Sequence, residues 1–155
     1  MVRFRLASTL PLLLVVALVA ASCSDDGDEA ERSVIDVAPR GPGTCLDFGE
    51  EVGATVTELP VVPCEEPHTH EIFAVVISQA GTYPGLDALE ADAQARCLRP
   101  FEDYVGVSAF DSELFYSWLV PTLTSWDRDD DREIICVAGE NNGAPLTGSV
   151  RDVGR

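Results

Sequence analysis

Residues 70–100, HEIFAVVISQAGTYPGLDALEADAQARCLRP, hold the two clearest structural signals in the chain, a strand and then a helix. The strand, residues 70–78, is apolar on both alternating faces, which is typical of a central strand covered on both sides. A turn at residues 82–85 follows. The helix after it places apolar side chains at helical spacing, at Leu86, Leu89, Ala93 and Cys97.

The segments around this pair complete the predicted fold. Pro100 predicts that the helix stops near Leu98, before a short turn carrying Phe101 and Tyr104. Further strands are expected at residues 46–48, 55–62, 113–120, 133–137 and 146–150. Strands, one main helix and strands again predict an α+β fold, in which the helix packs on an antiparallel sheet.

Four of the five cysteines lie in this region, at positions 45, 64, 97 and 136. Sequence alone leaves three pairings open. Proximity favours Cys45–Cys64, at the two ends of an expected hairpin, and Cys97–Cys136, which join the helix to a strand. The separations of 19, 33 and 39 lack the close pairs of zinc sites, so two structural disulfides are expected.

The N-terminal residues 1–22 have the three parts of an export signal: two arginines, an apolar run and small residues before Cys23. The stretch VAASC at residues 19–23 resembles a bacterial lipobox. It predicts a lipoprotein signal peptide, acylation of Cys23 and a lipid anchor on the extracytoplasmic face of the cell membrane. The alternatives are an ordinary cleavage site after Ser22 and a membrane-spanning helix, for which the 16-residue apolar run is short.

The region after the lipidation site, residues 23–43, is rich in acids and poor in apolar residues, which predicts a disordered tether. We expect the folded domain at residues 44–150 and a short tail at residues 151–155. With 46% apolar residues, the chain has enough hydrophobic side chains for one core.

The charge of the chain excludes several classes of function. Its 27 acidic and 10 basic residues give a formal net charge of −17, which argues against nucleic-acid binding. All ten basic residues are arginines. The absence of lysine excludes Schiff-base chemistry and the phosphate-binding P-loop.

Short motifs in a characteristic order suggest a family. They are GTC at residues 43–45, VPC at 62–64, PH at 67–68, EIFA at 71–74, YPG at 83–85, YVG at 104–106, PT at 121–122, DR at 131–132 and LTGS at 146–149. Together they resemble the septum-formation-related domain of actinobacterial lipoproteins and membrane proteins. The resemblance implies an envelope protein connected with division-septum assembly, and it brings no catalytic residues.

A metal site is not expected, although one set of residues could form it. His68 and His70 are the only histidines, and in an extended strand both rings would lie on one face with Glu71 beside them. A third ligand would have to come from Glu65, Glu66 or the acidic residues 127–131. A hydrogen bond between His68 and Glu71 across a turn is the simpler interpretation.

The most prominent candidate for a partner surface is residues 114–120, LFYSWLV. One alternating face of this strand presents Leu114, Tyr116, Trp118 and Val120. An aromatic face that one helix leaves partly open would suit a protein partner. The alternative is that loops bury it.

These observations predict a lipid-anchored accessory protein of the envelope that binds other envelope or division proteins. We expect no enzymatic activity and no cofactor, since no nucleophile with a positioned base can be named. The alternative is an extracytoplasmic sensor that binds a small ligand or a cation. An envelope hydrolase, using a chance pair of carboxylates, is the third hypothesis.

Overall fold

The structure is a computed structural model that describes residues 40–49 and 59–155. The signal peptide, Cys23 and most of the expected tether lie outside the described residues. Among the described residues, no helix is long and apolar enough to cross a membrane.

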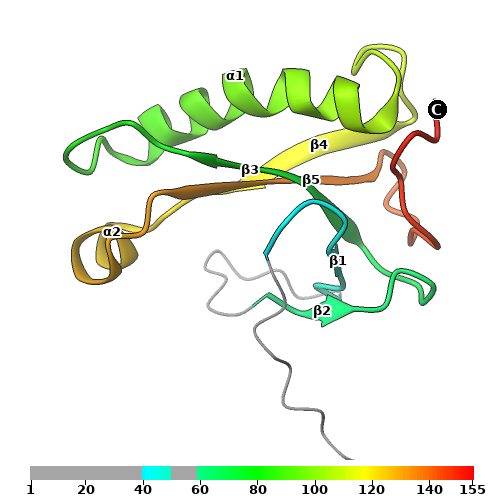
Figure 1. Cartoon of the computed structure of the whole chain (residues 1–155), viewed down its shortest axis with the longest axis horizontal. Coiled ribbons are helices and arrows are strands. Elements are labelled where there is room, and N and C mark those ends of the chain that lie inside the picture. Colours follow the sequence, from blue (N-terminus) through cyan, green and yellow to red (C-terminus); the bar gives the residue numbers. More distant parts are fainter. Residues whose placement is uncertain (1–39, 50–58) are drawn as a thin grey trace, which may run out of the picture. The chain divides into compact units, whose positions relative to one another are not determined.

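The described residues form a five-stranded antiparallel sheet with a long helix on one face (Figure 1). The strands are β1 (Cys45–Leu46), β2 (Val61–Val62), β3 (His70–Ile77), β4 (Leu114–Leu119) and β5 (Glu133–Glu140), in the order β2-β1-β3-β5-β4. The helices are α1 (Leu86–Val105) and α2 (Leu123–Asp129). The predicted α+β fold, with one main helix on an antiparallel sheet, is confirmed.

A β-bulge in β3 shapes the centre of the sheet. Ile72 lies opposite Val137 and Ala74 opposite Cys136, which leaves Phe73 as an extra residue. The ring of Phe73 packs edge-on against Phe101 of α1, with 5.6 Å between the centroids. The bulge therefore adds an aromatic side chain to the core between the sheet and the helix.

Helix α1 is longer than the sequence predicted. It continues through Pro100 to Val105, and the capping residue Gly106 has the left-handed φ of 87° that favours glycine. The predicted stop near Leu98 was wrong, because the apolar stripe extends beyond the proline to Phe101 and Val105, both of which are fully buried. Packing of this stripe outweighs the cost of about 3 kcal/mol for an interior proline.

The opposite face of the sheet carries a second apolar cluster. Ile72, Ile135 and Val137 pack there against Leu46 of β1, and partly buried side chains add to the contact: Phe48, Leu59, Val61, Val75 and Leu119. Apolar residues on both faces of β3 match the expectation for a covered central strand. The predicted pairing of residues 46–48 with a second segment is present as the short pair β1–β2, while residues 55–58 lie outside the described residues.

Both expected disulfides are present. Cys45–Cys64 closes the β1–β2 hairpin, and Cys97–Cys136 ties α1 to β5.

Two other predicted elements differ from the structure. The sequence did not predict α2, and residues 146–150 form no strand, because only Leu146 pairs with a neighbour, in a bridge to His68.

Gly139 of β5 provides a test of this packing. A methyl group at position 139 would lie 2.9 Å from the ring of Phe115 and 3.1 Å from the carbonyl oxygen of Thr69. We expect Gly139→Ala to lower the free energy of unfolding by about 1–3 kcal/mol, as overpacking does. Denaturant unfolding measures the change. Gly81→Ala is the matched control, since nothing lies within 4 Å of its added methyl group; equal stability of the two variants would contradict this packing.

Candidate functional site

A carboxylate with no exposure to solvent, that of Glu71, organises one end of the domain. Strand β3 directs its side chain toward the end of α1 and toward residues 149–150. Glu71 accepts hydrogen bonds from the Tyr104 hydroxyl (2.5 Å), the Ser149 hydroxyl (2.7 Å) and the Val150 backbone N–H (2.7 Å). These three donors compensate for the removal of a carboxylate from water.

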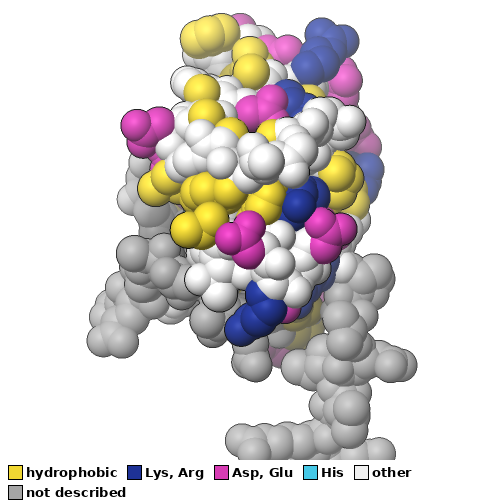
Figure 2. All heavy atoms as spheres, turned by 90° about the vertical axis from the view of Figure 1, so that its left-hand side faces the viewer, with side chains coloured by type: hydrophobic (Ala, Val, Ile, Leu, Met, Phe, Trp, Pro, Cys, Tyr) yellow, Lys and Arg dark blue, Asp and Glu magenta, His cyan; other side chains and the backbone are white. Residues whose placement is uncertain are grey.

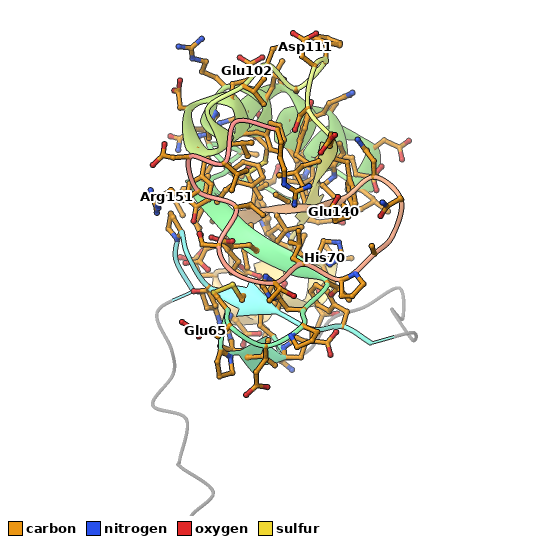
Figure 3. The ribbon with its side chains drawn as sticks, turned by 90° about the vertical axis from the view of Figure 1, so that its right-hand side faces the viewer. Glu65, His70, Glu102, Asp111, Glu140 and Arg151 are labelled. Atoms are coloured by element: carbon orange, nitrogen blue, oxygen red, sulfur yellow. A yellow bond between two sulfur atoms is a disulfide. The ribbon has the colours of Figure 1, made fainter. Side chains whose placement is uncertain are left out.

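The last residues of the chain are held at the same end (Figure 3). The backbone N–H groups of Asp152 and Gly154 donate to the carbonyl oxygens of Tyr104 and Val105. The guanidinium of Arg151 lies 4.2 Å from the centre of the Tyr104 ring. Residues 151–155, expected as a tail, thus dock on the end of α1.

His68 lies close to Glu71, and it is fully buried. Its Nδ1 is 2.8 Å from the carbonyl oxygen of Glu66, and because a carbonyl can only accept, Nδ1 carries the proton in the neutral ring. Nε2 then has a free lone pair. Within the described residues this buried atom has no hydrogen-bond partner.

His70 has a different environment, formed by aromatic rings. Its ring contacts Phe48 and Phe115 edge-on, with centroid distances of 5.3 and 5.8 Å. Burial, with a smaller contribution from His68, lowers the pKa of His70 below its usual value. Of the three residues that the sequence grouped, the described structure brings the ligand atoms of His68 and Glu71 together with that of Cys45, and His70 is not part of this group.

The structure also places the expected partner surface. Leu114 is only 1% exposed, and Tyr116, Trp118 and Val120 are half-buried against the core beneath α1. The expected open face is therefore largely covered, and Leu114 is part of the core.

Residues 127–131, considered as a source of a third metal ligand, form the end of α2 and the turn after it, where Asp130 pairs with Arg132 at 2.9 Å.

Sequence reasoning missed the partners of Glu71. Tyr104, Ser149 and the Val150 backbone are 33, 78 and 79 residues away along the chain. The available signal was Glu71 itself, a charged residue at the start of an otherwise apolar strand, which needs buried donors.

Replacing Glu71 tests its role. Glu71→Ala leaves three donors without an acceptor, at about 1–3 kcal/mol for each donor. We therefore expect the free energy of unfolding, measured with denaturant, to fall by at least about 3 kcal/mol. Ser149→Ala removes only one donor and should cost about 1 kcal/mol. Equal losses in the two variants would show that the network does not anchor residues 149–150.

Tyr104 gives a second test, at alkaline pH. Burial first, and then the hydrogen bond to Glu71, raise its pKa from 10.0 to about 12. Between these values the unfolded chain has lost the phenolic proton and the folded chain keeps it, so stability falls as the pH rises from 10 to 12. Unfolding measured across this window should be less dependent on pH in Tyr104→Phe. An unchanged pH dependence would contradict the raised pKa.

Comparison with known proteins gives the family. The family model described as septum formation matches residues 25–136, which is more than half of the chain. No curated protein and no solved structure gives a match. The resemblance drawn from the motifs is confirmed, and the match includes β1 to β4, both helices and all four disulfide-bonded cysteines. The chain therefore belongs to the septum-formation family.

Proposed function

We propose that this protein is a lipid-anchored accessory factor of septum formation that acts outside the cytoplasmic membrane by binding another protein. The family match supports the connection with septum formation. The export signal and the lipobox-like stretch before Cys23 support the anchor. The two disulfides, which persist in oxidising compartments, support a location outside the cytoplasm.

Binding requires an exposed surface, and the end of the domain where β3 ends and α1 and α2 begin offers one. Ile77, Leu86 and Leu123 are 47%, 51% and 54% exposed, and they lie at the end of β3 and the beginnings of α1 and α2. We call these three residues the end patch. Rings of Tyr83 and Trp126, 5.7 Å apart, join the loop before α1 to α2 at this end.

The surroundings of the end patch resemble those of protein interfaces. Figure 2 shows an apolar area at this end of the domain, with acidic and arginine side chains around it. An apolar centre with a polar rim is the usual arrangement of a surface that binds another protein. The end patch is the observation that favours a protein partner, and a partner of the division or wall-synthesis machinery is the one that the family suggests.

Photocrosslinking in intact cells tests this proposal. A crosslinking amino acid at position 123 should repeatedly capture one division or wall-synthesis protein, identified by mass spectrometry, and Ile77→Asp should remove that product. Position 110 is the matched control, because Phe110 is 91% exposed and belongs to the loop after α1. The same capture from both positions, or only random neighbours, would contradict a binding role for the end patch.

The anchor has its own test. We expect Cys23→Ser to move the protein from the membrane fraction to the soluble fraction, because acyl chains on Cys23 provide the attachment. Intact mass should show the acyl chains on the wild-type protein. A wild-type terminus without them would contradict the anchor and leave the crosslinking result unaffected.

A second candidate function, binding of a cation, is favoured by the unpartnered Nε2 of His68. It would agree with the alternative of an extracytoplasmic sensor. The residues near His68 that could complete such a site are Cys45 and Glu71.

A further inference from the structure

Three groups that can bind a metal ion meet at the buried end of the hairpin. Cys45, His68 and Glu71 each have at most 1% of their surface exposed. One ligand atom from each lies within 4.8 Å of the other two. In the described structure the sulfur of Cys45 is bonded to Cys64, so it is not available as a thiolate.

The orientation of His68 is that of a metal ligand. Metal-binding histidines usually donate the proton of one ring nitrogen to a carbonyl or carboxylate and bind the metal through the other nitrogen. His68 has this arrangement, because Nδ1 donates to the Glu66 carbonyl and the buried Nε2 has no partner in the described residues. A buried polar atom without a partner is rare and calls for an explanation.

Glu71 can bind a metal ion and keep its present contacts. A carboxylate has about four lone pairs. The hydroxyl groups of Tyr104 and Ser149 use the two on Oε1, and the N–H of Val150 uses one on Oε2. One lone pair of Oε2 is left.

The two disulfides differ in how accessible they are. Cys97 and Cys136 are fully buried, whereas Cys64 is half-buried and its sulfur lies near the surface. A thiolate of an external dithiol can attack the Cys64 sulfur, which breaks the bond to Cys45 and releases the Cys45 thiolate. The second thiolate of the dithiol then frees Cys64, so that the dithiol is oxidised by two electrons and both cysteines are reduced.

We propose that reduction of the Cys45–Cys64 disulfide by a dithiol creates a zinc site made of Cys45 Sγ, His68 Nε2 and Glu71 Oε2. Sulfur, nitrogen and carboxylate oxygen are the ligands that Zn²⁺ takes in proteins, and the fourth position is left for water or Cys64. Without a metal ion, a Cys45 thiolate buried beside the Glu71 carboxylate is unfavourable, so the released thiolate takes up a proton from water and becomes a neutral thiol. Zn²⁺ neutralises both charges, and its binding releases the thiol proton.

The surface beside this site favours entry of a cation. Glu65 and Glu66 are exposed on the loop that leads from Cys64 to His68, and Figure 3 labels Glu65 there. Their charges raise the local concentration of cations. The proposal goes beyond the role in septum formation and does not depend on it.

Two serine variants of the full chain test the site without any reductant. Cys64→Ser leaves Cys45 as a free thiol, while Cys45→Ser frees Cys64 instead; both variants keep Cys23 and the Cys97–Cys136 disulfide. We expect calorimetry to show one Zn²⁺ bound per Cys64→Ser chain. The affinity should be at least about 100-fold higher than that of Cys45→Ser, because loss of a metal ligand should cost no less affinity than loss of a residue that only orients a ligand. Co²⁺ should give a thiolate charge-transfer band in Cys64→Ser alone.

Further variants separate this site from chance binding. His68→Gln in the Cys64→Ser chain should lower zinc affinity by about 100-fold or more. Equal affinities of the two serine variants would overturn the proposal. If near-ultraviolet circular dichroism shows that Cys64→Ser is unfolded, the Cys45–Cys64 disulfide of the wild-type chain is reduced with a phosphine until alkylation of a sample labels Cys45 and Cys64 but not Cys97 or Cys136. Failure of that protein to bind Zn²⁺ would also overturn the proposal.

Discussion

The buried carboxylate of Glu71 determines how the sheet, the end of α1 and the last residues of the chain fit together at one end of the domain. A charge out of contact with water is stable only with several donors, and here they come from the end of α1 and from residues 149–150. The bulge at Phe73, two residues along β3, fills the core next to this network. The sheet, the helix and the last residues of the chain are therefore fixed by one set of contacts, and none of the three can shift without leaving a polar group unpaired.

The sequence predicted the elements whose signals are periodic and local. The apolar alternation of β3 and the stripe of α1 identified the centre of the fold, and the hairpin placed Cys45 near Cys64. The prediction from sequence failed at Pro100, where the rule that proline ends a helix competes with burial of Phe101. The prediction also missed helix α2. The partner of Thr122 in its capping box is Ser125 instead of the usual glutamate or glutamine. In addition, Trp126 of α2 is held by a contact with Arg132, whose guanidinium lies 3.8 Å from the centre of the ring.

The candidate site was predictable in composition but not in geometry. The sequence suggested possible metal ligands because three of them are neighbours along the chain: His68, His70 and Glu71. His70 packs against Phe48 and Phe115, and only long-range contacts bring Cys45 to His68 and Glu71. The end patch was missed for a similar reason, since Ile77, Leu86 and Leu123 each look like ordinary core residues, and only the end positions of their elements expose them.

The Cys45–Cys64 bridge also has a topological consequence. It closes residues 45–64 into a covalent ring, and both ends of the ring are fixed to β3 through β1. A protease that cut the backbone inside this ring would not release the N-terminal part of the chain from the domain. The same ring can accept inserted residues between its two strands with little loss of stability, because the entropy cost of loop closure grows only slowly with loop length.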